Sequence, residues 1–247
     1  MTVPEESTAA ELALSVQERL ARVARVAAAS NVGRTDPDFR TRAALEHWRQ
    51  VCPARYANAT LESLEELLND EEDPFPRVVY DEVRAWVDGD PPPGNVVIAG
   101  NLGVGKSWLA SVLCQATAER YGWRNEFVPL VRMFEEGNQS NARLGGLGTL
   151  DRYVKAHCLV IDDVGSGRTA LTESQEDRLY LVVNERWLAE RVTVITTNLE
   201  LPELETFIGV RIAERIKDGA IPIKLPGASR RQPGHRQPRL RSVEDDF

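Results

Sequence analysis

Residues 100–107 read Gly100-Asn101-Leu102-Gly103-Val104-Gly105-Lys106-Ser107, and no other segment constrains the architecture of this chain as strongly. The segment fits the pattern G-x-x-x-x-G-K-S/T, with an additional glycine at position 103. Glycine allows the backbone angles that turn successive N–H groups toward phosphate, and a helix starting at Lys106 adds the positive end of its dipole. In such a loop the lysine reaches the β- and γ-phosphates and the serine binds Mg²⁺. We therefore expect ATP and Mg²⁺ to bind here.

The sequence on both sides of the loop supports this interpretation. Val96–Ala99 is an apolar run typical of a strand, and residues 106–121 have the pattern of a helix, which is the context that such a loop requires. A chance match is the alternative, and this context disfavours it. Trp108 directly follows the loop, and we include it among the nucleotide-binding candidates. Stacking on a DNA base and packing of the first helix are its alternative roles.

Short apolar runs alternate with helical patterns beyond the loop. The expected strands are residues 96–99, 127–128, 158–161, 192–196 and 221–225, and the expected helices are residues 106–121, 130–136, 173–190 and 211–217. Cys158–Ile161 is apolar throughout, as a strand buried on both faces should be. Alternating strands and helices predict an α/β fold with a mainly parallel sheet flanked by helices.

The first 94 residues are expected to be mainly helical. The predicted helices are residues 8–29, 37–51, 61–68 and 76–88, and the proline run at 91–93 follows as a stiff connector. We divide the chain into a small N-terminal helical segment (1–52), a helical lead-in with a proline linker (53–94), the nucleotide-binding core (95–231) and a flexible tail (232–247). The apolar stripe of residues 8–29 is expected to pack within this chain or on a partner.

An acidic pair, Asp162-Asp163, follows the expected strand at 158–161. In phosphate-loop enzymes an acid at this point holds Mg²⁺, and a second acid can orient or deprotonate the attacking water. We assign Asp162, together with Ser107, to the metal and Asp163 to the water. Aspartate is one methylene shorter than glutamate, which leaves the catalytic reach of Asp163 open. An acidic pair in a surface turn is the alternative.

Asn198 follows the strand expected at 192–196. At the carboxyl edge of a parallel sheet, its amide would lie beside the γ-phosphate and could bind both phosphate and water. We therefore place Asn198 with Lys106 and Asp163 among the catalytic candidates. A turn-capping asparagine is the alternative.

The composition sets further limits. A net charge of −8 argues against a chain that coats nucleic acid through its overall charge, although a local basic patch is compatible with it. The three cysteines are far apart in the sequence and lack zinc-ligand spacing, which favours reduced thiols in a cytoplasmic protein. No signal peptide and no run of about 18 apolar residues is visible, so we expect no membrane partner.

Five motifs, in order along the chain, resemble the DnaC/IstB group of AAA+ ATPases. They are Ile161–Gly165, Val182–Trp187, Val194–Leu199, Gly209–Ile216 and Gly227–Arg231. The similarity extends over residues 53–231 and includes the segment Cys52–Thr60 that precedes the core. It implies a P-loop AAA+ core with a small N-terminal helical extension.

The resemblance also implies a head-to-tail homo-oligomer, assembled with ATP, in which one subunit completes the site of its neighbour. Arg211 matches the expected arginine finger and Arg215 the second arginine near it, with a solvated arginine pair as the alternative. Arg231 matches the family's closing arginine, which contacts nucleotide, and Arg230 lies beside it. Arg186 belongs to a further matching run, and pairing with an acid is its expected role.

The best-known task of this family is loading a hexameric replicative helicase onto single-stranded DNA. This is the function that we expect, with residues 1–52 gripping the helicase. An IstB-type transposition helper is the first alternative, and a nucleotide-dependent binding module with little turnover is the second. A small-molecule kinase fits less well, because no substrate lid motif is visible.

Overall fold

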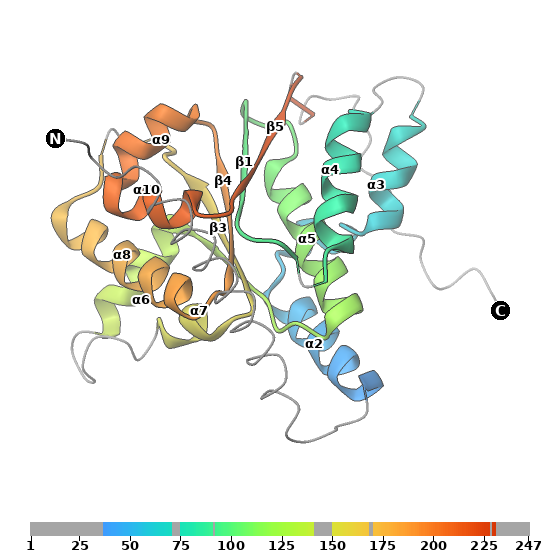
Figure 1. Cartoon of the computed structure of the whole chain (residues 1–247), viewed down its shortest axis with the longest axis horizontal. Helices are drawn as coiled ribbons and strands as arrows, with labels where there is room; N and C mark the ends of the chain where they lie inside the picture. Colours follow the sequence, from blue (N-terminus) through green and yellow to red (C-terminus); the bar gives the residue numbers. More distant parts are fainter. Residues whose placement is uncertain are drawn as a thin grey trace, which may run out of the picture. The chain divides into compact units, whose positions relative to one another are not determined.

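The phosphate-binding segment leaves one strand of a five-stranded parallel sheet with the order β2-β3-β4-β1-β5 (Figure 1). This computed structural model describes residues 37–70, 75–90, 92–140, 150–167, 170–227 and 229–230. Contacts divide the chain between Phe39 and Arg40, and the sheet belongs to the unit that begins at Arg40. The predicted α/β fold with a parallel sheet is confirmed.

The strands follow the expected apolar runs closely. They are β1 (Val96–Gly100), β2 (Glu126–Pro129), β3 (Cys158–Val164), β4 (Val192–Thr197) and β5 (Ile221–Leu225). All four pairings between neighbouring strands are parallel. β3 is longer than predicted, because the acidic pair Asp162-Asp163 remains in the strand within an irregularity between Ile161 and Val164.

Helices cover both faces of the sheet. On one side lie α2 (Pro37–Val51), a short 3₁₀ turn (Ala54–Tyr56), α3 (Leu61–Leu68), α4 (Arg77–Asp88) and α5 (Lys106–Tyr121). On the other side lie α6 (Leu130–Ser140), α7 (Asp151–Lys155), α8 (Glu173–Leu188), α9 (Leu201–Ile208) and α10 (Val210–Lys217). Figure 1 shows the two groups to the right and left of the strands.

The alternation of side chains along each strand builds two cores. Val96 and Ile98 belong to the core under α3, α4 and α5, whereas Val97 between them belongs to the core under α6 to α10. Successive side chains of a strand point to opposite faces, so a strand covered on both faces must be apolar throughout. This explains why β1 and the first four residues of β3 are apolar on both faces.

The lead-in helices are part of the first core. Thr60 caps α3 through a reciprocal capping box with Ser63, and Trp86 of α4 is fully buried. The indole N–H of Trp86 donates to the carbonyl oxygen of Gly94 at 3.0 Å, which fixes the end of the proline connector. The boundaries proposed at 52/53 and 94/95 stay predictions.

Two helices were not expected from the sequence. α7 has only five residues, which is too short for a periodic pattern to emerge. α9 begins with a capping box between Glu200 and Glu203, a start signal that glutamate gives less often than serine or threonine. The helix predicted at 8–29 and the tail at 232–247 lie outside the described residues.

Two cysteines that are far apart in the sequence meet in the first core. The Sγ atoms of Cys114 in α5 and Cys158 in β3 are 3.8 Å apart, and both residues are buried free thiols. Burial raises the pKa of the Cys114 thiol, and burial also raises that of Cys52 to about 11. Among residues that the structure describes, no group of His, Cys, Asp and Glu side chains has the arrangement of a metal site.

Across the described ranges, the helices are too short or too polar for any of them to span a membrane.

Candidate functional site

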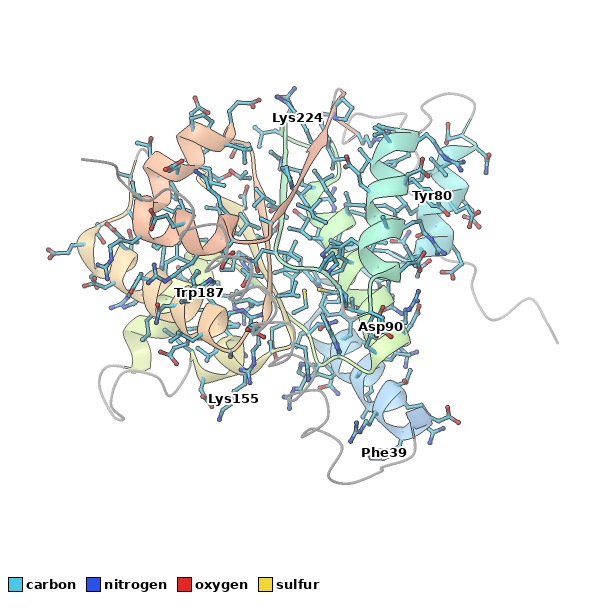
Figure 2. The ribbon with its side chains drawn as sticks, in the orientation of Figure 1. Phe39, Tyr80, Asp90, Lys155, Trp187 and Lys224 are labelled. Carbon is cyan, nitrogen blue, oxygen red and sulfur yellow. The ribbon has the colours of Figure 1, made fainter. Side chains whose placement is uncertain are left out.

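The candidate site lies at the carboxyl edge of the sheet. β1 runs directly into residues 100–107, and β4 lies between β1 and β3 in the strand order. Parallel strands end at the same edge, so the ends of β3 and β4 lie beside the phosphate-binding segment. Lys224, near the end of β5 and labelled in Figure 2, marks the same edge.

The side chain of Lys106 is folded into the loop. It is 7% exposed, and its Nζ donates to the carbonyl oxygens of Gly100 at 2.9 Å and Asn101 at 2.8 Å. Gly105 precedes α5 with a left-handed backbone (φ 106°), so the helix starts at the lysine itself. A buried ammonium group beside the N-terminus of a helix forms a site of concentrated positive charge that suits a phosphate group.

The end of the described chain packs on this loop. The backbone N–H of Arg230 donates to the carbonyl oxygen of Gly103 at 3.0 Å. A Cβ atom added to Gly103, whose φ is 81°, would lie 2.1 Å from the Oγ of Ser229. The Arg230 guanidinium lies 5.6 Å from the ring centroid of Phe75, just before α4. Arg231, the predicted nucleotide contact, lies outside the described residues.

Asp162 is a buried carboxylate at the end of β3. It is 8% exposed, and the hydroxyl of Thr196 in β4 donates to its Oδ1 at 2.6 Å. Burial raises the pKa of Asp162, while the hydroxyls of Thr196 and Ser107 and the positive charge of Lys106 act in the opposite direction. The structure therefore brings Asp162 close to Ser107 and Lys106. The metal-binding role assigned to Asp162 and Ser107 stays a prediction.

Asp163 has a different environment from Asp162. It is exposed and has a left-handed backbone (φ 61°), which is uncommon for a residue other than glycine. Its N–H donates to the Oγ1 of Thr196 at 2.9 Å, and Ser166 donates to its Oδ1 at 2.5 Å. The strained backbone turns the carboxylate out of the strand toward the loop that follows β3, and such conformations cluster at functional sites.

Sequence reasoning did not assign a role to Thr196 or Ser166. The Thr196 hydroxyl donates to Asp162 and accepts from the N–H of Asp163, so one side chain fixes both acids. The signal available in the sequence was the pair Thr196-Thr197 at the end of a strand that is buried throughout, since buried hydroxyls need hydrogen-bond partners. Ser166 gave no comparable signal.

Asn198 lies directly after β4 and is exposed. The preceding Thr197 is buried, and its hydroxyl donates to the carbonyl oxygen of Val164 at 2.8 Å and accepts from the N–H of Leu199 at 3.0 Å. These bonds fix the strand end on both sides of Asn198. The residue is thus held at the predicted edge with its side chain on the surface.

The chemistry of these groups fits a magnesium nucleotide. Mg²⁺ prefers carboxylate, hydroxyl and phosphate oxygens, and Asp162 and Ser107 supply the first two kinds. Partial neutralisation by a divalent cation also suits a carboxylate whose pKa is raised by burial. The Lys106 ammonium and the start of α5 supply the positive charge that phosphate requires.

The two predicted finger arginines lie elsewhere, on the face formed by α8 and α10. Their guanidinium groups lie over the ring of Tyr180, with Cζ to ring-centroid distances of 4.0 Å for Arg211 and 4.8 Å for Arg215. Trp187, labelled in Figure 2, belongs to the same cluster, with its ring centroid 5.4 Å from Arg215. The structure does not bring either arginine to the phosphate loop of the same chain.

Among the residues that the structure describes, no acid pairs with Arg186. Arg186 is fully buried, and its guanidinium donates to the Thr193 hydroxyl at 3.0 Å and to backbone carbonyls, including those of Tyr153 at 2.5 Å and Ala156 at 2.8 Å. Burial lowers its pKa to about 9, which still leaves it charged at neutral pH. Carbonyl dipoles at the end of α7, between α7 and β3, and at the start of β4 replace the acid, because a planar guanidinium can donate to several of them at once.

Trp108 is partly buried and packs against the core under α3, α4 and α5. This contact supports the packing interpretation that the sequence left open.

Comparisons with known proteins agree with this geometry. Residues 40–219 match the family model described as IstB-like ATP binding protein. The DnaC helicase loader has the same fold at a TM-score of 0.59 and 22% identity, with 70% of this chain and 100% of that chain covered. DnaI has a TM-score of 0.57 at 22% identity, with 72% and 94% covered. No curated protein sequence matches this chain.

A third solved structure is the replication initiator DnaA bound to AMPPCP and single-stranded DNA. Its TM-score is 0.56 at 17% identity, and the alignment covers 69% of this chain and 50% of that chain. Together these likenesses identify the AAA+ P-loop fold that the sequence predicted.

Proposed function

This chain belongs to the family of IstB-like ATP-binding proteins, and on that premise we propose that it hydrolyses ATP at the carboxyl edge of its sheet. The observation that carries the proposal is that the buried side chains of Lys106 and Asp162 lie near the partly buried Ser107. A cation, a hydroxyl and a carboxylate at the start of a helix form the set that a magnesium nucleotide needs.

Residues 100–107 would hold the phosphates through backbone N–H groups, and Lys106 would turn its ammonium from the loop carbonyls to the β- and γ-phosphates. Trp108 would pack behind the loop. Arg231 would contact nucleotide, since the docking of Ser229 and Arg230 on Gly103 brings the chain to the loop just before it.

Ser107 and Asp162 would hold Mg²⁺, and Thr196 keeps the Asp162 carboxylate oriented through its 2.6 Å hydrogen bond. When bound, the cation draws negative charge from the phosphate oxygens. Asp163 and Asn198 are the groups that we propose orient the attacking water. Both are exposed, Asp163 near the end of β3 and Asn198 directly after β4, and these two strands are neighbours in the sheet.

A second copy of the chain would complete the site. Arg211 and Arg215 lie on the α8–α10 face, so they can act on nucleotide only across an interface between subunits. An arginine supplied in this way stabilises the charge that develops during phosphoryl transfer. We therefore propose an ATP-dependent, head-to-tail homo-oligomer.

At the level of biology, we propose an ATP-dependent loader of a hexameric replicative helicase onto single-stranded DNA, acting in the cytoplasm. The fold shared with the DnaC helicase loader, over the full length of the chain in that solved structure, supports this proposal. Residues 1–52 would contact the helicase. The test is co-purification with the cognate helicase in ATP and ADP, beside a Lys106→Ala variant. Absence of a complex in every nucleotide condition contradicts the loader proposal.

A transposition helper of the IstB type is the second candidate, and the family model favours it. The same purification distinguishes the two, because a helper would retain a transposase in place of a helicase. A binding module with little turnover is the third candidate. It is favoured by the hydrogen bond between Ser166 and Asp163, which occupies the proposed water-orienting group. Steady-state ATP turnover that is lost in Asp162→Asn would exclude this candidate.

A further inference from the structure

One hydrogen bond holds the carboxylate of Asp163. The Ser166 hydroxyl donates to its Oδ1 at 2.5 Å, and in the described part of the chain the carboxylate has no other hydrogen bond. The two oxygens of a carboxylate move as one rigid group, so a bond at Oδ1 also fixes the place of Oδ2. Ser166 therefore determines where the whole acid group lies, although Oδ2 keeps lone pairs for further donors.

This bond directs the carboxylate toward its own turn. Ser166 follows Asp163 by three residues, and its backbone N–H also donates to the Asp163 carbonyl oxygen at 3.4 Å. Asp162 is directed differently, since its Oδ1 accepts from Thr196 and the hydroxyl of Ser107, in the phosphate loop, acts on its pKa. Among the described residues, no hydrogen bond links the Asp163 carboxylate to that loop. The two adjacent acids are thus held by different partners.

The backbone of the turn is fixed on the end of β4. The carbonyl oxygen of Val164 accepts from the Thr197 hydroxyl at 2.8 Å. Gly165 has a left-handed backbone (φ 90°), and a Cβ atom there would lie 2.3 Å from the Cδ1 of Leu199. With the backbone held at these points, the carboxylate can leave the serine hydroxyl by rotation about its own side-chain bonds, and the loop need not move.

The bonded orientation does not suit the reaction proposed for this acid. A water that attacks the γ-phosphate has to lie within hydrogen-bond distance of the acid that orients it, and in the proposed site that water lies on the side of Lys106 and Ser107. Aspartate has one methylene fewer than glutamate, so Asp163 has little reach to spare while the turn holds its carboxylate. The bonded orientation therefore fits a site at rest better than a site in reaction.

We infer that Ser166 is a positioning residue that holds Asp163 in a resting orientation, and that ATP turnover requires this carboxylate to rotate away from the serine. The inference rests on the proposed ATPase function and on the water-orienting role of Asp163, and it names a residue that limits the rate of the same site. Breaking a hydrogen bond to a charged group adds to the barrier of the step that needs the released group. Turnover is then slower than the phosphate loop and the metal ligands alone would allow.

The test is steady-state ATP turnover of the full-length protein at saturating ATP and Mg²⁺, over a range of protein concentrations. Ser166→Ala removes the donor and should raise kcat roughly three- to tenfold, which corresponds to one net hydrogen bond. The KM for ATP should not change, because Ser166 is not part of the phosphate loop. Ser166→Thr keeps the hydroxyl and should keep the wild-type rate.

A rise in kcat separates this role from a purely structural one, because a loosened or partly unfolded site would lower the rate. Ser63→Ala removes a capping hydroxyl from α3, outside the site, and is the matched control that should not raise kcat. In the Asp163→Asn background, Ser166→Ala should give no rise, since the group that it releases is gone. Asparagine also tolerates the left-handed backbone at this position.

An unchanged or lower kcat in Ser166→Ala would overturn the inference, as would an equal rise in the Asp163→Asn background. A rise that disappears at high protein concentration would overturn it as well, because it would reflect tighter assembly. If neither wild type nor Ser166→Ala turns over ATP, although both bind it, the proposed function is contradicted and the inference falls with it. Normal wild-type turnover without a gain in Ser166→Ala contradicts the inference alone.

Discussion

The carboxyl edge of the sheet and the α8–α10 face carry the two halves of the proposed catalytic machinery and are built in opposite ways. At the edge, Lys106 and Asp162 are buried, and backbone atoms and a strand hydroxyl hold them. On the α8–α10 face, Arg211 is exposed and held by an aromatic ring. The first half is complete in one chain, and the second has nothing to act on until another chain arrives.

The difference follows from the physical demands on each half. A group that binds phosphate in its own chain can be buried before the ligand comes, because loop carbonyls and hydroxyls satisfy it meanwhile. A group that must cross to another subunit has to stay at the surface, where only weak contacts can restrain it. Burial thus distinguishes the residues that we propose act within the chain from those that we propose act across an interface.

The largest expected effect is on turnover when either half is removed. Lys106→Ala and Arg211→Ala should each lower kcat for ATP at least about 10³-fold, because each deletes a positive charge that the transition state needs. Only Lys106→Ala should also abolish ATP binding, which calorimetry on the free subunit would measure. Lys155→Ala, at an exposed lysine paired with Asp151, is the matched control and should change neither quantity.

An equimolar mixture of Lys106→Ala and Arg211→Ala tests directly whether the two groups act from different subunits. At an interface where Arg211→Ala supplies the loop and Lys106→Ala supplies the arginine, both halves are intact. Random head-to-tail assembly makes about a quarter of interfaces of this kind, so roughly a quarter of wild-type turnover should return. If the mixture co-assembles but recovers no ATP turnover, Lys106 and Arg211 must act from the same chain, which contradicts the comparison.

The next effect in size is on the free energy of unfolding and concerns α8, the helix that carries Tyr180. Arg186 in α8 is fully buried among backbone carbonyls, so Arg186→Met should lower the free energy of unfolding by about 3 kcal/mol by leaving these acceptors unpaired. Urea denaturation measures the change. Arg132→Met, at an exposed i,i+4 ion pair in α6, makes the same substitution and should cost at most about 0.5 kcal/mol. Equal losses would contradict the structural role of Arg186.

A smaller effect is expected from Asp162→Asn, which should raise the Tm of the protein but lower its ATP turnover. Burial raises the pKa of Asp162, so its ionised form is less favourable in the folded than in the unfolded chain. Its contribution to stability is therefore fully present below the unfolded pKa and is lost as pH rises through the folded pKa. Asp162→Asn should raise the Tm of the nucleotide-free protein at neutral pH while turnover falls.

The Asp162 prediction is checked by calorimetric scans of both proteins in EDTA at neutral and acidic pH. The Tm difference should shrink as the pH falls and wild-type Asp162 takes up its proton. A variant that is less stable than wild type at neutral pH would show that the hydrogen bond from Thr196 outweighs the cost of the buried charge.

The smallest effect concerns the contact between the loop and the end of the described chain. Gly103→Ala places a Cβ atom 2.1 Å from the Ser229 Oγ and forces alanine into a left-handed backbone, so it should destabilise the docked segment by about 1 kcal/mol. ATP affinity should fall by less than about tenfold, since the other loop N–H groups remain. Pairing it with Ser229→Gly removes the clash but not the backbone strain, and a partial recovery of affinity separates the two causes.

The sequence predicted the edge of the sheet better than the α8–α10 face. Lys106, Ser107 and Asp162 stand in contiguous patterns whose local geometry is nearly independent of the rest of the fold, and the apolar strands fix which edge they share. The order of the five strands, however, arises from long-range pairing, and no single run of residues encodes it.

The contact of Arg211 and Arg215 with the ring of Tyr180 could not have been predicted in the same way. Tyr180 and Arg211 are distant in the sequence and meet only because α8 and α10 pack on the same face. The prediction that Arg186 pairs with an acid was wrong for a related reason. A run of residues does not reveal that backbone carbonyls from helix and strand ends surround one side chain. Asp163 shows a third limit, because its left-handed backbone depends on an irregular β3–β4 register.

The bond from the Arg230 N–H to the Gly103 carbonyl has a consequence for how this protein can be observed. An amide proton exchanges with deuterated water only when its hydrogen bond opens, so the deuterium uptake of this one backbone site records how often Arg230 leaves the phosphate loop. A change in loop conformation on nucleotide binding would alter that exchange rate directly. Hydrogen–deuterium exchange at Arg230, measured by mass spectrometry, therefore reports on nucleotide binding at the phosphate loop without a dye or probe attached to the protein.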